Sequence, residues 1–162
     1  MDINQLTARI PFWVLYLIAS CITVFDLTFT YLFLSEHARA YEGNPIHAFF
    51  AGVFGIEYFL FLIPVALITF YAIAKFGGWL IQYLDKRTQI NGENYVLVII
   101  SLFTFPNFLF NELFLTLFGT QLTLSGINLS LIVGVVLILG YILLTEMADR
   151  KAKKNASKSS VV

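Results

Sequence analysis

The sequence predicts an all-α, polytopic membrane protein: a bundle of four transmembrane helices. Of its 162 residues, 59% are hydrophobic and only 12% are charged, whereas roughly a quarter of the residues in a soluble protein are charged. The apolar residues gather in four long runs, and about 20 mostly apolar residues are enough to cross the hydrocarbon core of a bilayer. The basic residues lie between and after these runs, as expected for a chain that crosses a membrane repeatedly.

Each apolar run is continuous, without the alternation of a lipid-facing β-strand, so we predict helices. Pro11 is tolerated in the first turn of the first helix. We expect Pro64 to kink the second helix, Gly77 and Gly78 to end it, and Pro106 to lie near the middle of the third. The predicted helices form one domain over residues 1–147 and cover approximately residues 10–34, 47–76, 95–118 and 124–146.

The basic residues predict the orientation. They concentrate between the second and third helices and after the fourth, whereas the third connection carries no charge. Because cytoplasmic segments are enriched in Lys and Arg, we predict a multi-pass protein of the cell membrane with both the N- and C-termini in the cytoplasm. The residues that support this prediction are Arg9, Lys75, Lys86, Arg87, Arg150, Lys151, Lys153, Lys154 and Lys158.

Residues 148–162 form a polar tail rich in Lys and Ser. This composition predicts a basic, disordered cytoplasmic tail. The tail can serve as a topology determinant that also keeps the end of the chain in water, or it can hold anionic lipid.

Small residues recur every fourth position along the fourth helix, at Gly126, Ser130 and Gly134. Such a face lets helix backbones pack closely. It fits packing within the bundle, and it also fits association with another copy or with other membrane subunits. We expect the lipid bilayer as a partner, and without a basic groove with interleaved aromatic residues we expect no nucleic acid.

Three acidic residues interrupt the apolar runs: Asp26, Glu57 and Glu112. Ionisable groups inside a bilayer are costly and usually face the bundle interior or a water-filled cavity. At 1.5 Å per residue, all three are predicted at similar depth in the outer half of the membrane. On the helix surface, Thr30 shares a face with Asp26, and Asn107 shares a face with Asn111.

The predicted loop after the first helix lies next to this layer and contains Glu42 and Asn44. These two residues can cap and orient the second helix, or they can belong to a binding site. The candidate intramembrane site therefore comprises Asp26, Thr30, Glu42, Asn44, Glu57, Asn107, Asn111 and Glu112.

The segment Asp26-Leu27-Thr28-Phe29-Thr30, followed by Glu42-Gly43-Asn44-Pro45, resembles a family of small prokaryotic membrane proteins, the domain of unknown function 5658. The resemblance covers about the first third of the chain. Glu36-His37-Ala38-Arg39 stands where the family pattern has glycines. The resemblance implies that Asp26, Glu42 and Asn44 are shared polar positions, and it implies no activity.

Several functions remain open. Glu36, His37, Glu42 and His47 are residue types that bind metals, but their spacing matches no zinc signature. No nucleophile–base arrangement indicates an enzyme, and we predict no cofactor. We expect a non-enzymatic subunit or small binding protein of the membrane. The alternative is a proton- or cation-linked transporter or channel subunit that uses Asp26, Glu57 and Glu112.

Overall fold

The structure is a computed structural model that describes residues 7–36, 45–85, 91–118, 123–124 and 127–159. Within these residues, four helices are long and apolar enough to cross a membrane, which confirms the predicted fold class. The elements in chain order are α2 (Phe12–Glu36), α3 (Pro45–Phe54), α4 (Tyr58–Asp85), α5 (Gly92–Asn107), the π-helix η1 (Phe108–Leu113), α6 (Phe114–Phe118), β1 (Thr123–Leu124), β2 (Ile127–Asn128) and α7 (Leu129–Ser159).

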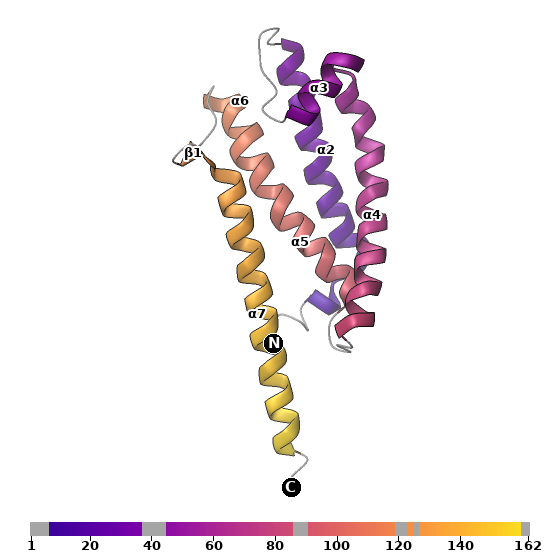
Figure 1. Ribbon diagram of the computed structural model, residues 1–162, viewed down its shortest axis with the longest axis vertical. Coiled ribbons are helices and arrows are strands. Elements are labelled where there is room, and N and C mark those ends of the chain that lie inside the picture. Colours follow the sequence, from indigo (N-terminus) through magenta and orange to yellow (C-terminus); the bar gives the residue numbers. More distant parts are fainter. Residues whose placement is uncertain (1–6, 37–44, 86–90, 119–122, 125–126, 160–162) are drawn as a thin grey trace.

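The helix α5 lies at the centre of the bundle and packs against α2, α4 and α7 (Figure 1). The chain runs in one direction along α2 and α5 and in the opposite direction along α4 and α7. We call the end where α3 covers the bundle the α3 end, and the opposite end, where α7 extends past the other helices, the tail end. The two short strands β1 and β2 pair antiparallel at the α3 end, just before α7.

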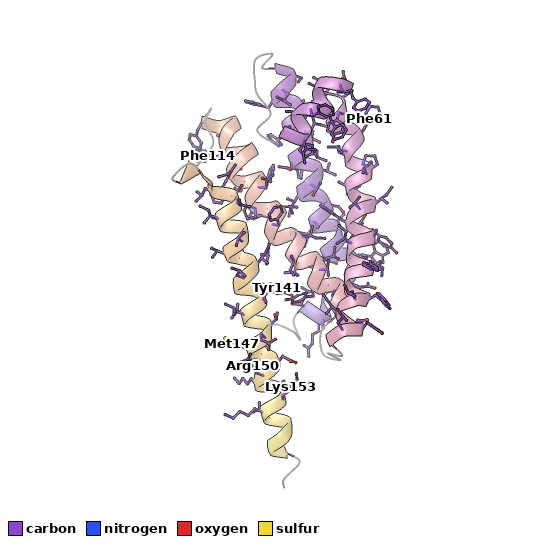
Figure 2. All side chains as sticks on the ribbon, in the orientation of Figure 1. Phe61, Phe114, Tyr141, Met147, Arg150 and Lys153 are labelled. Atoms are coloured by element: carbon purple, nitrogen blue, oxygen red, sulfur yellow. The ribbon has the colours of Figure 1, made fainter. Side chains whose placement is uncertain are left out.

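The outward surface of the bundle is strongly apolar. Figure 2 shows side chains projecting all around the helices; Phe61 on α4 and Met147 on α7 are 73% and 66% exposed. In water, such a large apolar surface is unusual for a monomer, whereas in a bilayer it is the surface that faces lipid. The interior is narrow, and its apolar cluster consists of Leu15, Ala74 and Leu97.

The second predicted helix is wrong as a single element, because the chain breaks between α3 and α4. Gly55 has a φ of +83°, a left-handed conformation that glycine adopts without the steric cost of a Cβ. The helix α3 ends just before it, and α4 begins three residues later, at Tyr58. The glycine therefore ends one helix and lets the chain turn into the next.

The predicted end of that helix at Gly77 and Gly78 is also wrong. The helix α4 continues through both glycines to Asp85. A Cβ on Gly78 would lie 2.6 Å from the backbone nitrogen of Glu93, and one on Gly92 would lie 2.5 Å from the carbonyl oxygen of Gly78. The glycines therefore act as contact points that let α4 and α5 approach closely, as small residues do between membrane helices.

The third predicted helix includes a change of helical type. Pro106 lies in α5, and η1 begins two residues later, at Phe108. Proline lacks the N–H that an α-helix needs, and a π-helical turn rearranges the bonding over a short stretch. The path continues through α6 to Phe118, the predicted end.

The fourth predicted helix begins and ends too early. The helix α7 starts at Leu129 and reaches Ser159, so the prediction of a disordered tail over residues 148–162 is wrong for the residues up to Ser159. Ion pairs one turn apart accompany the extension: Glu146 with Arg150 at 3.2 Å and Asp149 with Lys153 at 2.9 Å. Such pairs stabilise a helix modestly.

The described part of the small-residue face of α7 packs within the chain. Ser130 is 6% exposed, and a Cβ on Gly134 would lie 3.6 Å from the ring of Phe103 on α5. The third member of the face, Gly126, lies outside the described residues. Ser130 and Gly134 thus support packing between α5 and α7 of one bundle.

Candidate functional site

The structure brings together two of the predicted polar residues, Asp26 on α2 and Asn107 at the end of α5. The side-chain nitrogen Nδ2 of Asn107 lies 3.4 Å from each carboxylate oxygen of Asp26. Both residues are partly buried. The amide thus donates to both oxygens of a carboxylate, at distances near the long limit for hydrogen bonds. The arrangement places a carboxyl group between two helices of the bundle.

The local backbone around this pair differs from a regular helix. Asn107 is the last residue of α5, and η1 begins directly after it. Short π-helical stretches inside α-helices occur frequently at functional sites. Pro106 was the signal in the sequence, although proline alone did not predict a π-helix.

Thr30 lies one turn from Asp26, as predicted, but it bonds the backbone. Its Oγ1 donates to the carbonyl oxygen of Asp26 at 3.0 Å. Such a bond satisfies the buried hydroxyl within its own helix. Thr30 therefore lies beside the site, and its hydroxyl contacts the Asp26 backbone.

A hollow of about 170 Å³ adjoins the pair, between α5 and the start of α7. The side chain of Asn128 forms part of its wall and also organises the first turn of α7, because its Oδ1 accepts hydrogen bonds from the backbone nitrogen and the Oγ of Ser130, at 3.0 and 2.8 Å. An asparagine in this position caps the helix N-terminus. The residues that line the hollow are Phe103, Asn107, Asn128, Ser130 and Leu131.

Asn107 belongs both to the hollow and to the contact with Asp26. The hollow therefore combines amide and hydroxyl groups, one aromatic ring and a nearby carboxylate. This set can receive a small ligand that carries a cationic or hydrogen-bond-donating group.

Glu57 does not join this group. It lies between α3 and α4, and its side chain is exposed. It lies before the spanning part of α4, which begins at Tyr58, because Gly55 breaks the predicted helix. The prediction that Glu57 lies within a continuous second helix is therefore wrong.

Several other predicted residues lie outside the described part of the structure: His37, Glu42 and Asn44, together with the side chains of Glu36, Asn111 and Glu112. His47 lies on α3, with its ring 6.0 Å from that of Tyr58 and 5.9 Å from that of Phe59. Among the described residues, no group of three His, Cys, Asp or Glu side chains gathers as a metal site would require.

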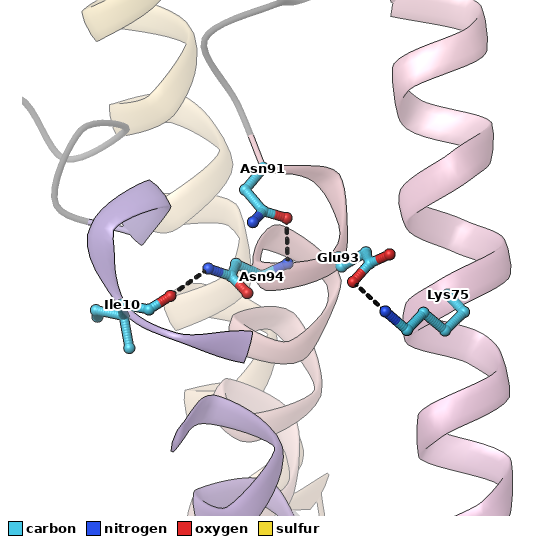
Figure 3. A network of polar contacts seen from close by, with 5 residues as sticks. All are labelled: Ile10, Lys75, Asn91, Glu93 and Asn94. Carbon is cyan, nitrogen blue, oxygen red and sulfur yellow. Dashed lines mark hydrogen bonds and ion pairs between the residues drawn. The ribbon is translucent and has the colours of Figure 1, made fainter. Parts of the chain in front are cut away.

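A second polar network, at the tail end, was missed by sequence reasoning (Figure 3). Asn94 is fully buried, and its Nδ2 donates to the backbone oxygens of Thr7 and Ile10 at 2.9 and 2.8 Å. Asn91 caps α5, since its Oδ1 accepts from the backbone nitrogen of Asn94 at 3.2 Å. The sequence signal was an asparagine just before an apolar run, a pattern typical of helix N-termini.

The same network includes an ion pair between α4 and α5. Lys75 Nζ lies 2.6 Å from Glu93 Oε2 and 4.3 Å from the centre of the Phe12 ring. This places α2, α4 and α5 around one ammonium group. The centre of the Tyr71 ring on α4 lies 5.7 Å from the same nitrogen, and Trp13 on α2 stacks on Tyr71. The network therefore joins three helices at the tail end.

The described structure defines a multi-pass membrane protein of four apolar helices with a polar pair inside the bundle. The sequence matches no family model, and neither the curated proteins nor the solved structures contain a match. The resemblance to the domain of unknown function 5658 stays a prediction, carried by Asp26 and the residues around it.

Proposed function

We propose that this chain is a small, non-enzymatic binding protein or subunit of the cell membrane, with its ligand site in the hollow beside Asp26 and Asn107. The observation that carries the proposal is the double role of Asn107, which contacts the Asp26 carboxylate and also lines the hollow. A carboxylate inside a membrane bundle is a functional site by default, because it is costly to keep there.

The chemistry of the hollow limits the ligand. A cavity of about 150 Å³ accepts a molecule as large as benzene, so the hollow of about 170 Å³ admits a small organic ion or a cation with its water. The Asp26 carboxylate attracts a positive charge, and the Phe103 ring attracts an ammonium group at its face. A small organic ammonium ion fits both groups.

The proposed orientation has the tail end and both termini in the cytoplasm. The helix α7 carries Arg150, Lys151, Lys153 and Lys154 at the tail end, and an excess of basic residues favours the cytoplasmic side. The hollow lies at the α3 end, and we therefore propose that it faces the outer side. Cysteine labelling from either side of sealed vesicles, at Lys154→Cys and Glu57→Cys, tests this orientation.

Thermal unfolding of the purified protein in detergent tests ligand binding. A ligand that binds only the folded state stabilises it, by about 2.7 kcal/mol at 100 times its Kd. We expect methylammonium chloride to raise the Tm above that in sodium chloride of equal ionic strength. The rise is lost in Asp26→Asn and retained in Glu57→Gln, which removes an exposed carboxylate.

Two results would contradict the proposal. One is an equal Tm of the unchanged protein in both salts at every concentration. The other is a methylammonium effect of the same size in Asp26→Asn, which would place the binding outside the proposed site. Ser130→Leu supplies a second test, because a larger side chain at the wall of the hollow reduces the space for the ligand.

A further inference from the structure

Two hydroxyl groups inside the bundle have no hydrogen-bond partner among the described residues: Ser20 Oγ and Thr23 Oγ1. Both residues lie on α2 and are 8% and 7% exposed. Leaving a buried polar group without a hydrogen-bond partner destabilises the folded state. Two such groups within one turn therefore indicate a partner that is not part of the described chain.

Other hydroxyl groups in the bundle differ from those of Ser20 and Thr23 because they have hydrogen-bond partners. Thr30, Ser101 and Thr104 each donate to a backbone carbonyl oxygen one turn earlier, at 3.0, 2.9 and 3.0 Å. Ser20 and Thr23 lie in the same kind of helix, with such carbonyls one turn earlier, but they make no such bond. Their hydroxyls remain available for a small molecule that can donate and accept.

These hydroxyls continue a row of oxygen groups that starts at the candidate site. Ser20, Thr23 and Asp26 are three residues apart, so each lies about 4.5 Å further along α2. Four residues before Ser20, the Tyr16 hydroxyl donates to the backbone oxygen of Leu67 at 2.9 Å. From Asp26 to Tyr16 the row covers about 15 Å along the helix and approaches the tail end. Water molecules bridge polar groups at such spacings.

We propose that Ser20 and Thr23 bind internal water, and that this water carries protons between the Asp26 carboxylate and the tail end of the bundle. A proton passes from a hydronium in this water to a carboxylate oxygen of Asp26, which leaves water and a neutral carboxylic acid; the reverse step restores both. The inference rests on the proposed function, in which the Asp26 carboxylate lies beside the ligand site. It adds a proton as a second ligand that reaches the carboxyl from the other side.

Among the described side chains, the other charged groups near α2 lie at the Tyr16 end of this row, away from Asp26. The elements packed against α2 are α4, α5 and η1. Their described charged side chains, Lys75 and Glu93, pair with each other at the tail end. The helix α4 also carries three tyrosines, Tyr58, Tyr71 and Tyr83, and the ring of Tyr71 packs on Tyr16. Among the described side chains of these elements and α2, Asp26 is thus the carboxylate next to the unpartnered hydroxyls.

Proton uptake into vesicles tests the inference. The full chain is reconstituted into vesicles of phosphatidylcholine and phosphatidylglycerol that contain the pH indicator pyranine, and a potassium gradient with valinomycin sets the potential. We expect proton uptake above that of protein-free vesicles. Asp26→Asn abolishes this difference. Thr23→Val lowers it about tenfold, which corresponds to a barrier higher by about 1.4 kcal/mol.

Matched variants separate the loss of a hydroxyl from a change in shape. Thr69→Val removes a hydroxyl from an exposed position of α4 and is expected to keep the full rate. Thr23→Ser keeps the hydroxyl and is expected to keep most of the rate, whereas Ser20→Ala lowers it as Thr23→Val does. Circular dichroism and gel filtration identify variants that fold.

Two outcomes overturn the inference: proton uptake equal to that of protein-free vesicles, or a folded Thr23→Val and Ser20→Ala pair at the full rate. The methylammonium effect on Tm tests the proposed ligand site independently of proton uptake. If Thr23→Val keeps that effect without proton uptake, the ligand site stands and only the water row fails. If both are lost in the unchanged protein, both proposals fail.

Discussion

The ammonium group of Lys75 lies 2.6 Å from the carboxylate of Glu93 and joins α4 to the first turn of α5. The two side chains remain 40% and 30% exposed, so the pair lies at the edge of the bundle. Its place beside the aromatic residues of α2 and α4 is the setting in which charged and aromatic side chains gather at a membrane–water boundary.

The Lys75–Glu93 pair is expected to contribute modestly to stability. Exposed ion pairs contribute about 0.2–1 kcal/mol, and a cation over an aromatic ring adds about 0.5–1 kcal/mol at an exposed site. We therefore expect a double-mutant cycle of Lys75→Met and Glu93→Gln to give a coupling free energy of unfolding of roughly 1 kcal/mol or less. Unfolding in mixed micelles measures it, and a cycle with Phe12→Leu isolates the share of the ring. A coupling of zero would show that the pair contributes nothing.

Replacing Asn94 is expected to have a larger effect. Its side chain is fully buried and holds the backbone oxygens of Thr7 and Ile10. Asn94→Leu removes two hydrogen bonds and leaves two buried acceptors, and unsatisfied groups cost about 1–3 kcal/mol each. Denaturant unfolding should show a loss of roughly 2–4 kcal/mol. Asn155→Leu, at an exposed position of α7, should change the free energy of unfolding little, and equal effects of the two variants would contradict the assignment.

The close approach of α4 to α5 predicts a contrast between two glycines. In Gly78→Ala the new Cβ would meet the backbone of Glu93 at 2.6 Å, so the helices must separate, and forced overpacking costs about 1–3 kcal/mol. A Cβ on Gly140 meets nothing within 4 Å, so Gly140→Ala should be neutral or stabilise α7 by up to about 1 kcal/mol. Thermal unfolding of the two variants checks the sign of each effect.

The break between α3 and α4 predicts a second glycine contrast. Gly55→Ala places a Cβ on a residue with a φ of +83°, which costs about 1–2 kcal/mol for a residue other than glycine. Gly52→Ala, inside α3 with nothing within 4 Å of the new Cβ, should stabilise the helix. Hydrogen exchange of residues 50–60 reports the local effect. Equal exchange in both variants would show that the left-handed conformation at Gly55 is not needed for the break.

The sequence predicted the number, type and approximate place of the spanning helices because apolar length and continuity carry that information. It also placed Asp26 and Asn107 in one candidate site of eight residues, because both are polar residues in apolar runs, but it did not predict the contact between these two. The sequence did not predict which glycines end a helix. Gly55 ends a helix and Gly78 does not, because the second is held inside α4 by its contact with α5, and no local pattern distinguishes the two.

The sequence also did not predict which hydroxyl groups lack a hydrogen-bond partner. Serine and threonine are common in membrane helices, and most of them bond their own backbone. Ser20 and Thr23 therefore gave no signal in the sequence, and their lack of a partner is visible only from the packed bundle. Likewise, Asn94 lies just outside the predicted third helix, and no local pattern indicates its role, because its partners, Thr7 and Ile10, are more than 80 residues away in the chain.

The length of α7 determines how far this helix extends beyond the bilayer. Its 31 residues span about 46 Å at 1.5 Å per residue, while the hydrocarbon core is about 30 Å thick. The helix is therefore about ten residues longer than the core requires, and its charged residues from Arg150 onward predict that this excess lies at the tail end, outside the hydrocarbon. We expect a fluorophore attached near Asn155 to lie at a measurable distance from the bilayer, and not on the lipid surface. A protein that binds the basic residues at the end of α7 would therefore be held at a distance from the membrane by the same helix that crosses it.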